Sequence, residues 1–269
     1  MPTVSIGDAD IYYEIHGSGE PVLLVAGLGG SGSYWAPNLP TFARRYQTIV
    51  HDHRGTGAST RSRIEYSIEQ MADDLLRLMD RLHIESAHLV GHSTVGAIGQ
   101  VIGIEHPERL RSMVLYASWD RSDPFLRRIM AARRALVLDS GAAAYLAATP
   151  FFLYPDWWIN ENEGLLRERE KNALPGFPGA EIAASRIAAV LAFDRTSDLH
   201  RITTPTLVLC ANDDFLTPPY MSQALVDAIP GARSERLQHG GHACSEVSPR
   251  EFEQRVLTFI EGCVARRTS

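Results

Sequence analysis

Three side chains of the sequence have the types and the order needed for nucleophilic attack on a carbonyl group. Ser93 follows the apolar run 87–91, Asp214 follows the apolar run 205–211, and His242 follows the stretch 232–238. A serine hydroxyl needs a base to remove its proton, a histidine supplies that base near neutral pH, and a carboxylate fixes the histidine tautomer. The sequence therefore predicts a Ser–His–Asp triad, with each member in a loop after a strand.

The turn that carries Ser93 departs by one residue from the pattern of a nucleophile elbow. That pattern, G-x-S-x-G, places the serine on a sharp turn between a strand and a helix. Residues 91–96 read G-H-S-T-V-G, so the second glycine is Gly96 and Val95 occupies its usual place. Val95 is expected to strain the turn or reshape the pocket floor unless Gly96 compensates. The alternative interpretation, in which Ser93 only caps the next helix, leaves the other two triad residues unexplained.

Neighbouring residues compete for the acid and base roles. Asp213 and Asp214 are adjacent, so they cannot both face the histidine. We prefer Asp214, because an Asp-x-x-x-Pro stretch then runs to Pro218, and we expect Asp213 to cap a turn. His239 ends a strand, and the two glycines after it let the loop swing back, which favours His242 as the base.

Other histidines lie close together in the sequence, but their spacing does not indicate a metal site. His51 and His53 lie in the stretch HDHRG, and three ligands bunched at one strand end cannot close a tetrahedral site unless others join. No H-E-x-x-H motif is present. His92, beside the nucleophile, is expected to pack beneath the elbow. We therefore predict neither a metal nor another cofactor.

The glycine-rich loop 26–35, AGLGGSGSYW, is expected to stabilise a developing oxyanion. Backbone N–H groups are the usual donors, one from the residue after the nucleophile and one from such a loop. The predicted donors are the N–H groups of Thr94 and Leu28, and Gly29 is expected to line the pocket. The loop has neither G-x-x-x-x-G-K-[ST] nor G-x-G-x-x-G spacing, which argues against nucleotide binding.

Short apolar runs alternate with amphipathic stretches along most of the chain. Run 21–27, PVLLVAG, is uninterrupted, as expected for a strand buried on both faces. Stretch 67–84 has one apolar face and a capping box from Ser67 to Gln70. This alternation predicts an α/β fold, a mostly parallel sheet flanked by helices.

Residues 119–198 break the alternation and are expected to form a helical lid inserted after the sixth strand. Residues 1–118 and 199–269 are then the core. The lid is rich in aromatic residues, and those expected to line the substrate pocket, together with Gly29 and Val95, are Phe151, Phe152, Tyr154, Trp157 and Trp158. Four arginines near them are expected to form a solvated helix face: Arg127, Arg128, Arg133 and Arg134.

Composition narrows the class of protein further. The chain has 269 residues and a formal net charge of −6, which disfavours nucleic acid as a partner. Three scattered cysteines indicate a reducing cytoplasm. The N-terminus lacks the features of a signal peptide, and the apolar runs are too short to span a bilayer. We expect a cytoplasmic monomer or homodimer that acts on a small molecule away from membranes.

The segment 52–60, DHRGTGAST, is similar to the D-x-R-G-x-G-x-S stretch of α/β-hydrolases. Five further segments look like the pyrimidine-utilisation D proteins, which are regarded as carbamate or aminoacrylate hydrolases; they are GLGGSGSYW, RGTG, YSIEQMA, FFLYPDWW and GGHACSEVSP. The resemblance implies an α/β-hydrolase fold and covers both the core and the lid.

These observations leave three hypotheses about function. The first is a serine hydrolase that cleaves carboxylic esters or lactones, such as short or medium acyl esters or acyl-homoserine lactones, through an acyl-enzyme. The second, which the resemblance implies, is a carbamate or aminoacrylate hydrolase. The third is a non-catalytic ligand-binding homologue that keeps only the fold.

Overall fold

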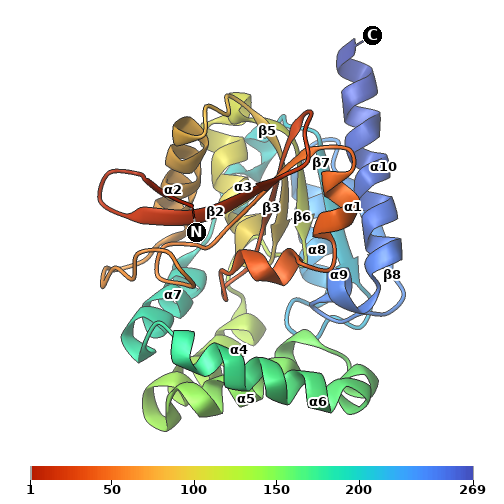
Figure 1. Ribbon diagram of the computed structural model, residues 1–269. Coiled ribbons are helices and arrows are strands. Elements are labelled where there is room, and N and C mark those ends of the chain that lie inside the picture. The colour runs from red at the N-terminus through yellow and green to blue at the C-terminus, as the bar shows by residue number, and fades with distance from the viewer. Residues whose placement is uncertain (1, 269) are drawn as a thin grey trace.

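The computed structural model describes residues 2–268 and has a central eight-stranded sheet covered by helices (Figure 1). The strand order is β1-β2-β4-β3-β5-β6-β7-β8, in which β2 pairs antiparallel with both β1 and β4 and the remaining pairs are parallel. The strands are β1 Thr3–Ser5, β2 Asp10–His16, β3 Pro21–Val25, β4 Gln47–His51, β5 Ala87–His92, β6 Leu110–Tyr116, β7 Thr206–Ala211 and β8 Arg233–Leu237.

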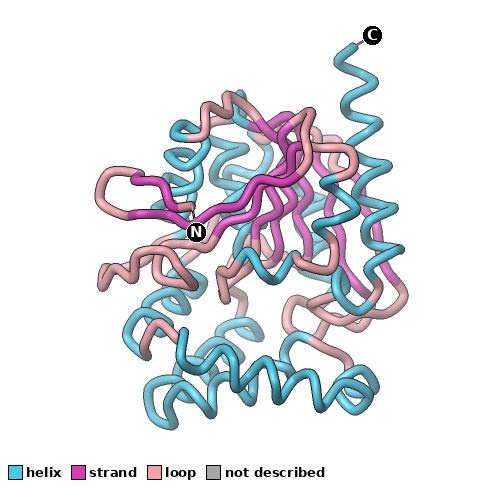
Figure 2. Tube along the Cα trace, viewed as in Figure 1, coloured by secondary structure: helices cyan, strands magenta, loops and turns pink. Residues whose placement is uncertain are grey.

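Helices connect the parallel strands and continue to the end of the chain (Figure 2). The α-helices are α1 Leu39–Ala43, α2 Ile68–Arg81, α3 Thr94–Glu105, α4 Pro124–Ala135, α5 Gly141–Leu153, α6 Asp156–Ala173, α7 Ala180–Ala192, α8 Pro219–Ala228, α9 Cys244–Val247 and α10 Pro249–Thr268. A π-helical turn, η3 (Leu136–Ser140), joins α4 to α5.

Alternate residues of the buried strands pack on opposite faces of the sheet, because successive side chains of a strand point to opposite sides. In β3, Leu23 belongs to the core formed with α2, α3 and α8, whereas Leu24 belongs to the core formed with α1 and α10. Both residues are fully buried, which explains why the strand reads as an uninterrupted apolar run.

Helix α2 shows half of the predicted capping box. The Ser67 hydroxyl accepts a hydrogen bond from the Gln70 N–H at 3.0 Å, as predicted. The Gln70 side chain does not complete the box, because its amide donates to the Asp74 carboxylate one turn further along α2. That carboxylate accepts two hydrogen bonds from the buried Arg54 guanidinium, which makes it a strong acceptor.

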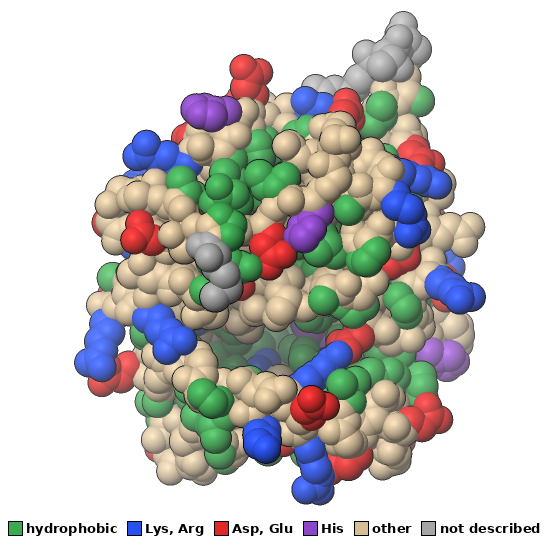
Figure 3. Space-filling model, viewed as in Figure 1, with side chains coloured by type: hydrophobic (Ala, Val, Ile, Leu, Met, Phe, Trp, Pro, Cys, Tyr) green, Lys and Arg blue, Asp and Glu red, His purple; other side chains and the backbone are tan. Residues whose placement is uncertain are grey.

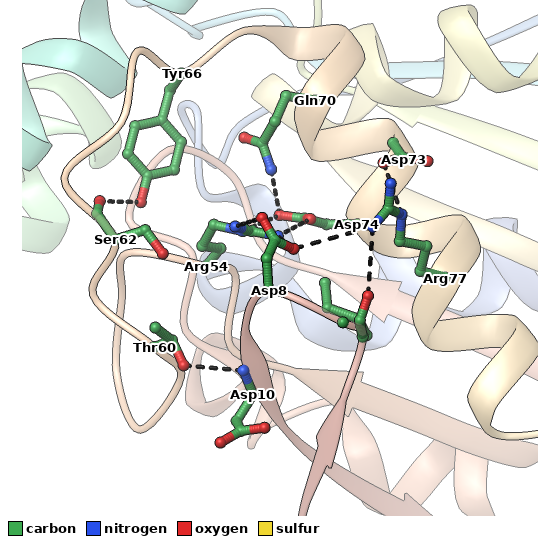
Figure 4. A network of polar contacts seen from close by, with 12 residues as sticks. Asp8, Asp10, Arg54, Thr60, Ser62, Tyr66, Gln70, Asp73, Asp74 and Arg77 are labelled. Atoms are coloured by element: carbon green, nitrogen blue, oxygen red, sulfur yellow. Dashed lines mark hydrogen bonds and ion pairs between the residues drawn. The ribbon is translucent and has the colours of Figure 1, made fainter.

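Arg54 joins the sheet edge to α2 through two carboxylates (Figure 4). It is only 5% exposed and forms paired hydrogen bonds of 2.8–2.9 Å with both Asp74 and Asp8. The guanidinium lowers the pKa of Asp8 to about 2, by hydrogen bonding more than by charge. Two carboxylates thus compensate this buried charge.

Residues 119–198, called the inserted segment from here on, leave the sheet after β6 and return before β7. They contain helices α4 to α7, which lie together at one end of the sheet in Figure 1. The segment contacts the core close to the predicted site: the Ala243 N–H donates to the Leu153 carbonyl at 2.9 Å, and the Tyr154 hydroxyl donates to Glu246 at 2.8 Å.

One stretch of the inserted segment, Pro124–Leu153, is long and apolar enough to cross a membrane by length and composition alone. The prediction that no apolar run has sufficient length missed it, because polar residues interrupt the run. A single crossing would separate β6 from β7, yet Met113 of β6 pairs with Thr206 of β7 in one sheet. Only 11% of its most apolar window is buried, and most residues of α5 within the stretch are half-buried.

Candidate active site

The structure brings the three predicted triad residues to the carboxyl ends of neighbouring strands. Ser93 directly follows β5, Asp214 lies in the loop after β7, and His242 lies in the loop after β8. Parallel strands present their carboxyl ends along one edge of the sheet, which is where α/β sheets place their ligand sites. All three side chains are buried, with exposed fractions of 6%, 3% and 1%.

Ser93 occupies a strained turn between β5 and α3. Its φ of 55° and ψ of −113° are sparsely populated for any residue except glycine. Two backbone hydrogen bonds hold the turn, from the Ser93 N–H to the Tyr116 carbonyl at 2.7 Å and from the Gly96 N–H to the Ser93 carbonyl at 2.8 Å. The Ser93 side chain makes no capping bond to α3, so the capping interpretation is wrong and the hydroxyl is left for other partners.

Gly96 takes over the close approach that the elbow pattern assigns to the preceding position. A Cβ atom on Gly96 would lie 2.2 Å from the Ser118 hydroxyl oxygen, in the loop after β6. Val95 is itself fully buried, and it packs where a Cβ on Gly91 would lie only 2.9 Å from it. The absence of a side chain at Gly96 therefore allows α3 to approach the end of β6, and its absence at Gly91 leaves space for Val95.

Changing Gly96 to alanine is expected to lower the free energy of unfolding by about 1–3 kcal/mol, because the new methyl group collides with Ser118. The measurement is urea unfolding of the parent and of Gly96→Ala, compared with Gly262→Ala, where a Cβ meets no atom. Adding Ser118→Gly to Gly96→Ala is expected to restore most of the loss. Equal stability of Gly96→Ala and the parent would contradict the packing described here.

Asp214, and not Asp213, contacts the histidine. The Asp214 carboxylate oxygens lie 3.0 and 3.2 Å from His242 Nδ1. Thr217 donates its hydroxyl and its N–H to the same carboxylate at 2.8 and 2.9 Å, which fixes its orientation. An acceptor at Nδ1 keeps the proton on that nitrogen and leaves Nε2 free to act as a base.

Asp213 holds the histidine loop from its other side. Its carboxylate accepts hydrogen bonds from the N–H groups of Gly240 and Gly241, the latter at 2.8 Å. Both glycines have positive φ, 141° and 61°, so the loop takes a path that residues with a Cβ disfavour. Asp213 was predicted to cap a turn, but its carboxylate bonds a loop far along the chain instead and shapes the loop that carries His242.

Two residues whose roles the sequence does not reveal fix the backbone of the histidine. The Tyr116 hydroxyl donates to the His242 carbonyl at 2.8 Å, and His92 Nε2 lies 3.0 Å from the same oxygen. Burial, with the His242 charge, holds the pKa of His92 well below its usual range, so His92 is a neutral donor. Tyr34 stacks on the His92 ring at 4.6 Å. His92 thus packs beneath the elbow, as expected, and also positions the base.

The loop after β3 lies against the nucleophile. A Cβ atom at Gly27 would lie 3.0 Å from the Ser93 Cβ, so Leu28 follows a residue in close contact with the elbow. Thr94 is the first residue of α3, and its N–H is one of the free donors at the helix N-terminus. Of the predicted oxyanion donors, Thr94 directly follows Ser93, and Leu28 directly follows Gly27, which contacts the elbow. Gly29 is exposed, with open space beside it.

His53 supports this loop from within the core. The His53 ring nitrogen Nε2 lies 2.9 Å from the Ala26 carbonyl, and the His53 backbone N–H donates to the Gly30 carbonyl at 2.8 Å. Burial holds the pKa of His53 well below its usual range and lowers that of His51 to about 4, so both are neutral. Within residues 2–268, no group of three or more His, Cys, Asp or Glu side chains is arranged to hold a metal ion.

The five aromatic residues predicted to line the pocket occupy different positions. Phe151, Tyr154 and Trp157 line a cavity of about 640 Å³ that also involves His239 and Asp213 but not Ser93. Phe151 is 69% exposed. Trp158 is buried and stacks on Tyr154 at 4.2 Å, and Phe152 packs against the cation of Arg133.

Comparison with known proteins agrees with this architecture. Residues 20–249 match the family model described as alpha/beta hydrolase fold. The chain is 44% identical over 259 residues to an Azorhizobium caulinodans protein named "Putative carbamate hydrolase RutD", which covers 96% of this chain and 98% of that protein. A Caulobacter vibrioides protein of the same name is 39% identical over 268 residues and covers 97% of this chain.

Solved structures show the same fold. An enol-lactonase from Burkholderia xenovorans superimposes with a TM-score of 0.89 at 24% identity, covering 97% of this chain and all of that one. Est816, described as an N-acyl homoserine lactone degrading enzyme, superimposes with a TM-score of 0.83 at 27% identity, covering 96% of this chain. The chain therefore belongs to the α/β-hydrolase family and is a hydrolase related to the RutD proteins.

Proposed function

We propose that this protein is a serine hydrolase that cleaves carboxylic esters or lactones through an acyl-enzyme. The proposal rests on the hydrogen bond between the Asp214 carboxylate and Nδ1 of His242. This pair lies at the same edge of the sheet as Ser93, which occupies a strained turn. That arrangement supplies a nucleophile, a base and the group that orients the base.

In the proposed first half-reaction, Ser93 Oγ attacks the substrate carbonyl carbon while His242 Nε2 takes the hydroxyl proton. The carbonyl π electrons move to the oxygen, and the N–H groups of Leu28 and Thr94 stabilise the resulting oxyanion. The oxyanion collapses, the bond to the leaving alkoxide breaks, and His242 gives its proton to the alkoxide. In the second half-reaction His242 takes a proton from water as the water oxygen attacks the acyl carbon. The bond to Ser93 Oγ then breaks, His242 returns the proton to that oxygen, and the acid product leaves.

A second candidate is hydrolysis of a carbamate, favoured by the names of the relatives that are 39–44% identical over nearly the whole chain. The two candidates differ in the bond that breaks, carbon–oxygen in an ester or lactone and carbon–nitrogen in a carbamate. A measurement of ammonia release therefore distinguishes the two candidate activities.

Burst kinetics with 4-nitrophenyl acetate and 4-nitrophenyl butyrate test the proposal. We expect nitrophenolate to appear in a burst equal to the enzyme concentration, and mass spectrometry to locate the acyl group on Ser93, because the activated nitrophenyl ester acylates the serine faster than water removes the acyl group. Ring opening of an acyl-homoserine lactone and ammonia release from a carbamate are measured in parallel. Ammonia release without ester or lactone turnover would favour the second candidate. No turnover of any substrate would favour a ligand-binding protein.

A further inference from the structure

Two arginines of the inserted segment are buried without a carboxylate partner. Arg133 of α4 is 5% exposed and Arg186 of α7 is 2% exposed. Within residues 2–268, neither forms an ion pair. We call these two residues the arginine pair. The prediction that Arg133 belongs to a solvated helix face is wrong, whereas its neighbour Arg134 is exposed as predicted.

Arg54 shows how this chain compensates a buried guanidinium elsewhere. It has the same exposed fraction as Arg133, and it forms ion pairs with Asp8 and Asp74 (Figure 4). Removing a cation from water carries a large desolvation penalty, which charged partners normally offset. Neither member of the arginine pair has such an ion-pair partner among the described residues, so each would bind an anion more strongly than a paired arginine would.

Arg186 places its charge beside the loop that is proposed to hold the oxyanion. Its Nη2 donates to the Leu28 carbonyl at 3.2 Å, and its Nη1 donates to the Arg54 carbonyl at 2.9 Å. The Tyr66 ring packs on the guanidinium at 5.5 Å. Burial lowers the pKa of Arg186 to about 10, so the group is still cationic at neutral pH. Among the described residues its hydrogen-bond and ring contacts are all with neutral groups, and the Asp74 carboxylate acts on it through its charge without forming an ion pair.

Arg133 has a donor that nothing satisfies. Its Nη2 donates to the Tyr145 hydroxyl at 2.9 Å, and its guanidinium lies 5.2 and 5.1 Å from the ring centres of Tyr145 and Phe152. Its Nε is buried and has no hydrogen-bond partner within residues 2–268. A buried N–H without an acceptor is costly, and an oxygen of a bound ligand would supply the acceptor that the protein does not.

The two guanidinium groups share Tyr145 as a neighbour. Helix α4 packs on helix α7, and Tyr145, the hydroxyl partner of Arg133, also acts electrostatically on Arg186. The space-filling view is hollowed between the sheet domain and the inserted segment, and a basic side chain is visible among hydrophobic ones inside the hollow (Figure 3).

We propose that Arg133 and Arg186 form an anion subsite that binds a carboxylate carried by the substrate. The substrate class is then a small organic acid whose ester or lactone carbonyl lies a few bonds from the carboxylate. The position of the carbonyl rests on the function proposed for Ser93, whereas anion binding by the arginine pair does not. The guanidinium groups take no part in making or breaking bonds, and their role is limited to selecting the substrate.

A pair of matched esters tests the subsite. Monomethyl succinate carries a carboxylate, and methyl 4-methylpentanoate replaces that carboxylate with an isopropyl group of similar shape. The parent is expected to prefer the acid in kcat/KM, and Arg133→Gln or Arg186→Gln to lower the acid-to-neutral ratio about 10- to 100-fold. Arg133→Lys, which keeps the charge, is expected to lose less of the ratio than Arg133→Gln. The ratio is informative even where Arg186→Gln also disturbs the oxyanion loop.

Arg134→Gln is the matched control, because it removes the same charge from an exposed neighbour on α4, and it should leave the ratio unchanged. Calorimetry with succinate measures binding without turnover. We expect binding by the parent and by Ser93→Ala, and at least tenfold weaker binding by the glutamine variants.

An unchanged ratio and unchanged succinate binding in both glutamine variants would overturn the subsite, even if Ser93-dependent turnover continued. Succinate binding that depends on the arginine pair, without Ser93-dependent turnover, would support the subsite and reject the serine mechanism. Absence of succinate binding by the parent, together with no preference for the acid ester, would also overturn the subsite.

Discussion

Replacing Ser93 by alanine is expected to lower kcat for ester hydrolysis by about 10⁶-fold, because the acyl-enzyme then has no oxygen on which to form. Some acceleration over water should persist, since the Leu28 and Thr94 N–H groups are retained. The melting temperature should change little, because alanine keeps the same strained φ of 55°. Steady-state kinetics and thermal unfolding of the same preparation measure both effects.

Ser112→Ala is the matched control for this variant. Ser112 is also a fully buried serine, but it hydrogen-bonds His88 on β5, away from the triad. It should keep its turnover within a few-fold of the parent. Loss of less than tenfold in Ser93→Ala would exclude a serine nucleophile.

Asp214→Asn is expected to lower kcat by about 10⁴-fold, with a smaller change in KM. An asparagine amide retains the shape of the carboxylate but can donate to Nδ1 of His242. That donation favours the tautomer whose proton lies on Nε2, where the base must be free. Thr217 holds either side chain in place through its N–H and hydroxyl, so the fold should survive. The measurement is kcat and KM for 4-nitrophenyl butyrate.

Asp213→Asn makes the same change one residue earlier. Its carboxylate accepts from Gly240 and Gly241, so its loss loosens the histidine loop without altering the tautomer. We expect less than a tenfold fall in kcat and a lower melting temperature. Equal losses of kcat in the two variants would show that the adjacent carboxylates share the role that we assign to Asp214.

The sequence predicts the parts of the site that depend on strand ends. Each triad residue follows an apolar run, and parallel strands bring those ends together, so Ser93, Asp214 and His242 could be placed without coordinates. Only one of the adjacent residues Asp213 and Asp214 can face the histidine, and the Asp-x-x-x-Pro stretch that runs to Pro218 favoured Asp214. Local order and the direction of the strands decide these features.

Features that depend on tertiary packing were not predictable in this way. Arg133 lies among three other arginines, and helical spacing alone does not show that it alone turns inward. Arg186 stands in an alanine-rich helix with no motif around it. Tyr116 ends a buried strand, and its hydroxyl reaches the histidine carbonyl only because the β8 loop folds back over it. Such contacts join segments far apart in the chain.

The backbone of Ser93 places folding and chemistry in conflict at one position. A left-handed φ costs a residue with a Cβ about 1–3 kcal/mol, and glycine avoids most of that cost. Selection for stability alone would therefore favour glycine at position 93, at the expense of the hydroxyl. A chain relieved of its activity would drift toward that replacement, so the retention of a serine at this position is a sign that its hydroxyl is in use.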